Sequence, residues 1–208
     1  MRFIVIDTET TGTDLERDQV IELGAVAVDT DVHPSEWKEF HTLVRHDRYS
    51  GSAYALALNA EILGVLGGRI ESDETVTHID NLGLAFKNWL TSCGYVSLLR
   101  DDHSNKITIT VGGKNIASFD VLLLKRTNIV DFVIFRHRYL DAISGFTDLN
   151  TDAIPPSIEL CKERAGLPAV VNHRALDDAW DATYLILSKM TFQPVENLFW
   201  IFNKISNR

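Results

Sequence analysis

The sequence predicts an α/β fold in which helices flank a mixed β-sheet. Three apolar segments joined by short links come first, at 2–7, 20–29 and 36–46, and this pattern is typical of an antiparallel meander. Strand and helix patterns then alternate along the chain, which favours parallel strands added to the same sheet. Because the segment 2–7 is apolar on both faces, we expect it in the centre of that sheet.

Later elements follow from the period of the apolar residues. The segment 106–113 alternates apolar and polar residues and is predicted to be one strand, and 131–142 contains another short strand. The segment 95–105 has neither period, so we expect an inserted loop or a short hairpin there. Helical spacing predicts helices over 52–68, 75–92, 116–128, 155–167 and 173–189.

The chain length suits one domain. Its 208 residues predict a single domain over 1–190, followed by a terminal helix over 191–208. Apolar residues in that last segment, such as Leu198 and Phe202, recur at helical spacing, which favours a helix docked on the same domain. A helix that binds a partner protein is the alternative.

Composition limits the classes of function. Hydrophobic residues make up 45% of the chain, and no apolar run reaches the ~18 residues that a membrane span needs. The two cysteines, Cys93 and Cys161, form no metal-type spacing and no disulfide framework, so we expect a reducing, cytoplasmic location. No signal peptide is expected, because the apolar run 3–6 is shorter than the roughly 7–15 residues that one needs. The net charge of −9 argues against extensive binding of duplex nucleic acid. It does not exclude a nuclease, because carboxylates that bind metal ions add negative charge.

Two acids stand at the end of the first predicted strand. In the stretch "IDTETTG", 6–12, Asp7 and Glu9 are two residues apart and therefore share a face of the strand. Ionised carboxylates this close repel each other, and a bound Mg²⁺ or Mn²⁺ would remove that cost. The alternative is a strand that runs out into a solvated turn.

A third acid belongs to the stretch "GKNIASFD", 113–120. On a helix that begins near Ile116, Asp120 shares a face with Leu123 and Leu124, so its carboxylate is expected to point inward. An unpaired charge is costly in such a place. The alternative is a carboxylate in the first turn, favoured by the helix dipole.

The last polar cluster is "NHRALDDAW", 172–180. Asp178 lies on the apolar side of the predicted helix, whereas Asp177 and Asp181 are assigned to its solvated side. His173 precedes the helix and could lean over the same place as Asp178. A surface or capping histidine is the alternative.

Taken together, the three stretches resemble the DEDDh family of 3′–5′ exonucleases, the DnaQ-like proofreading group. The resemblance extends from residue 2 to about residue 189. It implies a ribonuclease H-like fold, with residues 1–190 as the exonuclease domain. The residues that carry it are Asp7 and Glu9, then Asn115, Phe119 and Asp120, then His173 and Asp178.

The resemblance also implies a mechanism. Four carboxylates, those of Asp7, Glu9, Asp120 and Asp178, would bind two divalent metal ions, Mg²⁺ or Mn²⁺, and hydrolysis would release nucleoside 5′-monophosphates. His173 would act as the general base, since imidazole titrates near working pH. Contacts to the terminal nucleotides are assigned to Thr10, Thr11, Gly12, Asn115 and Phe119.

The expected substrate is the 3′ end of single-stranded DNA. The stretch reads Thr-Glu-Thr-Thr-Gly, as DNA proofreaders often do, and this favours DNA over RNA and a proofreading or repair role. A polymerase or another replication protein is a potential partner, and no membrane is expected. An RNA-trimming exonuclease and a non-catalytic scaffold remain as alternatives.

Two further positions concern the family pattern. Asn59 stands near the place where many relatives carry a His-Gly-Ile turn, so contacts to the terminal base or sugar differ there. Asp141 ends a predicted strand and is interpreted as structural.

Overall fold

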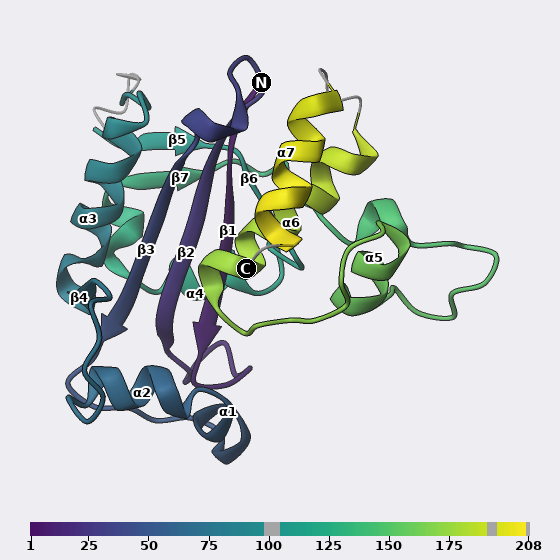
Figure 1. Ribbon diagram of the computed structural model, residues 1–208. Coiled ribbons are helices and arrows are strands. Elements are labelled where there is room, and N and C mark those ends of the chain that lie inside the picture. Colours follow the sequence, from purple (N-terminus) through teal and green to yellow (C-terminus); the bar gives the residue numbers. More distant parts are fainter. Residues whose placement is uncertain (98–104, 191–194, 207–208) are drawn as a thin grey trace.

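The structure is a computed structural model that describes residues 1–97, 105–190 and 195–206 (Figure 1). Six strands form the main sheet, in the order β4-β3-β2-β1-β6-β8, and β5 and β7 form a second sheet. The strands are β1 (Arg2–Thr10), β2 (Val20–Asp29), β3 (Lys38–Arg45), β4 (Val76–His78), β5 (Ile107–Ile109), β6 (Val111–Gly113), β7 (Val133–Phe135) and β8 (Leu140–Asp141). The helices are α1 (Ala53–Leu58), α2 (Ala60–Leu66), α3 (Ile79–Ser92), α4 (Asp120–Leu124), α5 (Ile158–Arg164), α6 (Ala175–Lys189) and α7 (Val195–Ser206).

The sheet has the predicted mixed topology. Strands β1, β2 and β3 form an antiparallel meander, and β6 and β8 add parallel strands beside β1. β1 is therefore central, as its double-sided apolar pattern predicts. The predicted α/β fold with a mixed sheet flanked by helices is confirmed.

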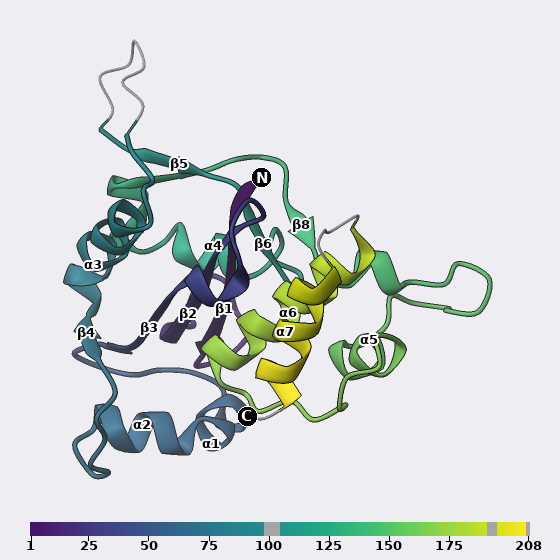
Figure 2. The same cartoon turned by 45° about the horizontal axis from the view of Figure 1, so that its top comes forward.

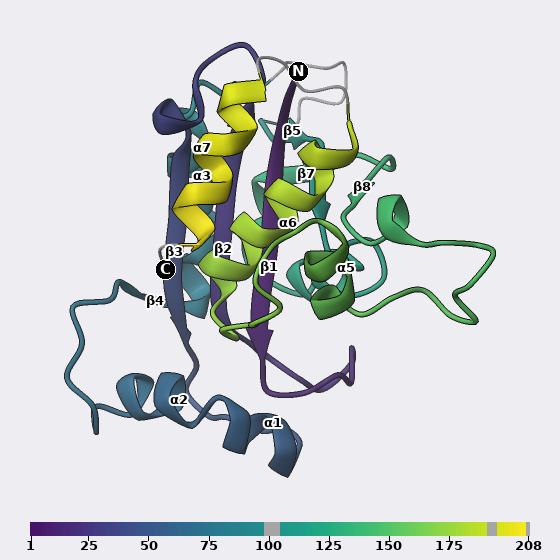
Figure 3. The same ribbon diagram turned by 45° about the vertical axis from the view of Figure 1, so that its right-hand side comes forward.

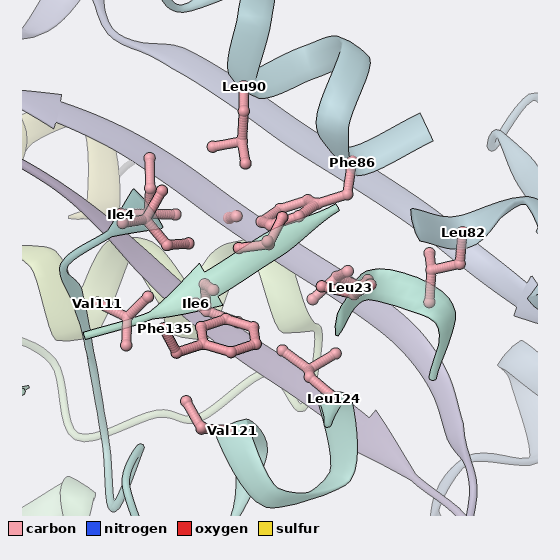
Figure 4. Close-up of a cluster of buried hydrophobic side chains, with 14 of the residues drawn as sticks. Ile4, Ile6, Leu23, Leu82, Phe86, Leu90, Val111, Val121, Leu124 and Phe135 are labelled. Carbon is pink, nitrogen blue, oxygen red and sulfur yellow. The ribbon is translucent and has the colours of Figure 1, made fainter. Parts of the chain in front are cut away.

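Helices cover both faces of this sheet. On one face, Phe3 and Val5 of β1 pack with α6 and α7, and on the other, Ile4 and Ile6 pack with α3 and α4. Figure 2 shows α6 and α7 on one side of the strands and α3 on the other. Figure 4 shows the second of these clusters, with Phe86 of α3 over the strand residues.

The strand β1 runs beyond its parallel neighbour. Pairing with β6 joins Ile4 to Val111 and Val5 to Gly112, whereas pairing with β2 continues as far as Thr10. The last part of β1 thus keeps one edge that β6 does not cover. Figures 1 and 3 show α1 and α2 beyond the end of the sheet at which β1 finishes.

Three predicted elements are divided in the structure. The helix predicted over 52–68 is two helices, because Asn59 turns its side chain inward and donates a hydrogen bond to the Thr10 carbonyl at 3.0 Å. The strand predicted over 106–113 is two strands, since the chain passes from the small sheet to the main one at Thr110. The segment predicted as helix over 75–92 begins with β4.

The helix predicted over 116–128 is much shorter. Only Asp120–Leu124 is α-helical, because Phe119 has backbone angles of φ −132° and ψ −81°. Asn115 has a φ of 51°, in the left-handed region. The irregular backbone before α4 places Asp120 at the first position of the helix.

The remaining predicted elements agree with the structure to within a few residues. The segment predicted as a loop or hairpin, 95–105, falls largely on 98–104, outside the described residues. Helix α7 packs on α6, where Lys204 lies over the Trp180 ring at 4.3 Å. Lys204 also forms an ion pair with Glu39 of β3 at 2.6 Å. Within the described ranges, no helix combines the length and the apolar character that crossing a bilayer requires.

A glycine in β2 lets α6 approach the sheet. A Cβ atom at Gly24 would lie 2.3 Å from backbone atoms of Ala175 and Leu176, at the start of α6. No side chain can move aside there, since the clash is with backbone. The start of α6 therefore depends on the absence of a side chain at this position.

We predict that Gly24→Ala destabilises the protein by about 1–3 kcal/mol, because α6 must shift away from β2. Denaturant unfolding measures the change. Gly64→Ala is the control: its Cβ would meet only side-chain atoms of Ile70, the Cδ1 at 2.5 Å and the Cγ1 at 2.9 Å, and this exposed side chain can rotate away. Alanine also favours the helix. Equal stability of Gly24→Ala and the parent would contradict this role.

Candidate active site

A pocket of about 440 Å³ lies beside the last part of β1. Four segments of the chain contribute to its lining: 7–13, 114–120, 158–159 and 171–178. The predicted residues that line it are Asp7, Glu9, Asn115, Phe119, Asp120, His173 and Asp178. All four predicted carboxylates and the predicted base are therefore brought together.

The first two carboxylates come from the uncovered part of β1. Asp7 lies opposite Gly24 and Glu9 opposite Glu22 in the pairing with β2. Glu9 is 8% exposed and interacts with the side-chain amide of Asn59. Asn59 thus contacts both Glu9 and the Thr10 carbonyl, a role that its sequence position alone did not indicate.

Asp120 reaches the pocket from the opposite face of the sheet. It is 3% exposed, and its carboxylate accepts a hydrogen bond from the Thr8 hydroxyl at 2.7 Å. Thr8 points to the α4 side of β1, whereas Asp7 points to the α6 side. Because β6 ends before this part of β1, no strand separates the two faces of the sheet there. One pocket can therefore include side chains from both faces.

His173 and Asp178 come from the start of α6. Ligand-type atoms of Glu9, His173 and Asp178 all lie within 4.8 Å of one another. His173 is exposed and has a φ of 50°, a left-handed conformation that is uncommon for a residue other than glycine. Strained backbone of this kind is often found at functional sites.

A buried glutamate fixes the start of α6. Glu22, on β2, is fully buried and accepts hydrogen bonds from the Arg174 side chain at 3.1 Å and from the Ala175 backbone N–H at 3.2 Å. Its carboxylate also lies 2.6 Å from His41 Nε2. These contacts hold the residue that follows His173, and with it the left-handed turn.

The crowded carboxylates favour their protonated forms. Burial raises the pKa of Asp7 well above its ordinary value, and the charges of Asp120, Asp178 and Glu9 add to this effect. Burial likewise raises the pKa of Glu9 to about 7, with a contribution from Glu22.

The other two carboxyls behave alike. Burial raises the pKa of Asp178 to about 7, and Asp181 and Glu9 contribute. Burial raises the pKa of Asp120 to about 6, although the Thr8 hydrogen bond opposes the shift.

This donor set matches a divalent cation. It offers carboxylate oxygens, which are the ligands that Mg²⁺ and Mn²⁺ prefer. These carboxylates repel one another, and the positive charge that the protein supplies nearby does not balance their negative charge. Lys114 is the one lysine or arginine of the pocket lining in the described part of the chain. The sequence interpretation did not single out Lys114, although it directly precedes Asn115.

Not every predicted contact residue lines this pocket. Thr11 is fully buried, and its hydroxyl accepts a hydrogen bond from the Gln19 backbone at 2.9 Å. The Thr10 hydroxyl donates to the Gly12 carbonyl at 2.8 Å, so this stretch stabilises its own turn. Thr13 lines the pocket instead, whereas Thr10, Thr11 and Gly12 are outside its lining.

Asp141 has the structural role that its position suggests. Its carboxylate accepts hydrogen bonds from the backbone N–H groups of Asn115 at 3.0 Å and Ile143 at 2.9 Å. It therefore joins the end of β8 to the turn that precedes α4.

The prediction that Asp181 faces solvent is wrong. Asp181 is 5% exposed and forms an ion pair with Lys162 of α5, itself 4% exposed. Lys162 also donates to the Val170 carbonyl, in the segment that leads to His173. The helical period counted Asp181 as polar and therefore outward, but α5 supplies a buried cation on that side of α6. Asp177 is partly buried, and its carboxylate accepts from Asn172 at 3.4 Å.

Comparisons with known proteins concern the family and the fold. Residues 4–62 match the model of the RNase_T family, described as exonuclease. The chain superimposes on a solved structure of exonuclease I with a TM-score of 0.60 and 13% sequence identity. That structure is described as one that suggests how processivity is achieved. The alignment covers 97% of this chain and 43% of that one, so the chain spans less than half the length of exonuclease I. No curated protein matches in sequence. The predicted resemblance to DnaQ-like 3′–5′ exonucleases is confirmed by the family match and the fold.

We predict a pH-dependent stability for the cation-free protein. The pKa values of Glu9 and Asp178 are about 7 in the folded state, against about 4 in an unfolded chain. Protons therefore bind more tightly to the folded state, and this stabilisation is complete below about pH 4 and lost as the pH rises through about 7.

Thermal unfolding in EDTA at pH 5 and pH 8 tests the prediction. Asp178→Asn should raise the melting temperature at pH 8 and have less effect at pH 5, since it removes one crowded charge. The matched control Asp177→Asn, on the neighbouring helical position, should change both melting temperatures alike. The same shift for both variants at both pH values would contradict the assignment.

The buried ion pair gives a second prediction. Lys162→Met should destabilise the protein by about 3–5 kcal/mol, because Asp181 would keep a buried charge without its partner. In the double variant Lys162→Met/Asp181→Leu, most of that loss should be recovered. Urea unfolding of the two variants measures both values, and a loss below ~1 kcal/mol for the single variant would contradict the pairing.

Proposed function

We propose, starting from the DnaQ-like exonuclease resemblance, that this protein is a metal-dependent 3′–5′ exonuclease that acts on single-stranded DNA. The observation that carries the proposal is the meeting of Asp7, Glu9, Asp120, Asp178 and His173 in one pocket, although they come from three distant segments. We assign the activity to residues 1–190 as one exonuclease domain, with 191–208 as its docked terminal helix.

The four carboxylates would hold two divalent cations, Mg²⁺ or Mn²⁺. Bound there, the cations would neutralise the carboxylates, activate the attacking water and stabilise the oxygen that leaves. Asp7 is central to this assignment, because the charges of the three other carboxylates all act on it. Asp120 approaches from the other face of the sheet and depends on Thr8 for its orientation.

His173 would take the proton from the attacking water. It lies at the exposed side of the pocket, close to Glu9 and Asp178, where water from the solvent can reach it. Histidine is the side chain that most often serves as a general base. The products would be nucleoside 5′-monophosphates.

The choice of DNA rests on the Thr-Glu-Thr-Thr-Gly stretch, 8–12. RNA trimming is the alternative enzymatic function, and scaffolding on the same fold is the non-catalytic one. A role in proofreading or repair, with a polymerase as partner, follows from the resemblance and is part of the proposal. We place the protein in the cytoplasm, where Cys93 and Cys161 would remain reduced; both are free thiols in the structure.

Time courses on matched DNA and RNA oligonucleotides test the proposal. With a 5′ label and Mg²⁺ or Mn²⁺, the strand should shorten stepwise from its 3′ end, and EDTA should stop the reaction. Faster trimming of RNA would replace the DNA assignment by the RNA alternative. Binding without any trimming would favour the scaffold.

Variants at the pocket test the residue roles. Asp7→Ala should abolish trimming, and His173→Ala should slow it by roughly 10²–10⁴-fold, the usual contribution of a general base. Asp178→Asn should be inactive, whereas the matched control Asp177→Asn should retain activity, because Asp177 is outside the pocket lining. Parent-like rates for Asp7→Ala would refute the site.

A further inference from the structure

Lys114 is the one lysine or arginine among the described residues that line the acidic pocket. It lies between Gly113, at the end of β6, and Asn115, whose left-handed backbone is held by a hydrogen bond to Asp141 at 3.0 Å. Gly113 is also paired with Asp141 in the sheet. Lys114 is therefore fixed on both sides by the same short strand, and its side chain lines the pocket.

The positive charge of Lys114 acts on every carboxylate of the pocket lining. This charge lowers the pKa values of Asp7, Glu9, Asp120 and Asp178 alike, and that of Glu159 on the other wall. The ammonium group forms no hydrogen bond or close ion pair with the residues that the structure describes, unlike Lys162, whose ammonium group is engaged by Asp181 and Val170. Lys114 thus keeps its hydrogen-bond donors available.

We propose that Lys114 binds a backbone phosphate within the 3′-terminal nucleotides of the substrate strand. This inference rests on the proposed function. A nucleic acid strand that enters the pocket meets five carboxylates, and Lys114 is the one lysine or arginine of the described lining. It can therefore offer a phosphate oxygen a positive charge together with a hydrogen bond. A lysine suits this task because its ammonium group is a compact charge on a flexible stem.

A simpler role would be that of a counter-ion for the carboxylates. In that case Lys114 would influence metal affinity and stability but not the strand. The two roles differ in what a charge-removing substitution changes. Loss of a phosphate contact changes strand affinity and its salt dependence, whereas loss of a counter-ion changes metal affinity and stability and leaves strand affinity unchanged.

Fluorescence anisotropy of a 5′-labelled single-stranded oligodeoxynucleotide tests the proposal. The measurement uses the full chain with Mg²⁺ in the His173→Ala background, in which hydrolysis is slow. Lys114→Met should weaken binding about tenfold or more, and the slope of log affinity against log salt should fall by ~0.7, the value for one phosphate contact on a single strand. Lys114→Arg should keep most of the affinity, since its charge remains. The control Lys125→Met removes an exposed charge outside the pocket and should bind like the parent.

A neutral linkage identifies the phosphate. Methylphosphonates placed singly at the three linkages nearest the 3′ end should weaken binding to the parent at one position, and Lys114→Met should lose nothing further there. Equal losses for both proteins at every position would overturn the proposal. Unchanged strand binding of Lys114→Met, with tighter Mn²⁺ binding by calorimetry, would also overturn it in favour of the counter-ion.

These outcomes separate the inference from the proposed function. If the parent background binds no oligonucleotide, the proposed function fails and the inference fails with it. If the parent binds and Lys114→Met binds equally well, the exonuclease proposal stands and only the role of Lys114 is rejected.

Discussion

The crowding of four carboxylates at the end of a buried strand is the constraint on which the rest of the site depends. Burial disfavours the charged forms and raises the pKa values of all four carboxyls, and the charges of neighbouring acids raise those of Asp7, Glu9 and Asp178 further. A protein without a use for this arrangement would be more stable with neutral side chains there. Divalent cations remove the conflict, because they supply the positive charge that Lys114 by itself does not.

The fold brings the acids together by ending one strand early. β6 stops at Gly113 while β1 continues to Thr10, so the uncovered edge of β1 opens to both faces of the sheet. Asp120 arrives from one face through its bond to Thr8, and Asp178 from the other on α6. Residues outside the pocket lining fix the start of α6. Gly24 allows the close approach, and buried Glu22 holds the backbone directly after the left-handed turn of His173. The contacts around His173 and Asn115 thus hold both residues in a left-handed backbone conformation.

Sequence periodicity predicted the meander and the inward direction of Asp7, Glu9, Asp120 and Asp178, because these features depend on local geometry. Predictions that needed a tertiary partner were wrong. Asp181 was assigned to the solvated side by its period, yet Lys162 of α5 buries it. The helix over 52–68 divides at Asn59, since that amide bonds to Thr10 on a distant strand. In each case the decisive contact lies far along the chain or on another element.

Calorimetric titration of the metal-free protein with Mn²⁺ shows whether the crowded carboxylates bind metal ions. We expect two saturable sites per chain and, at about pH 6.5, release of protons on binding, because carboxyls with pKa values of about 7 must ionise to become ligands. Comparison of buffers with different ionisation enthalpies counts those protons. Binding without proton release, or equal binding by Asp7→Ala, would contradict the claim that crowded carboxylates form the metal site.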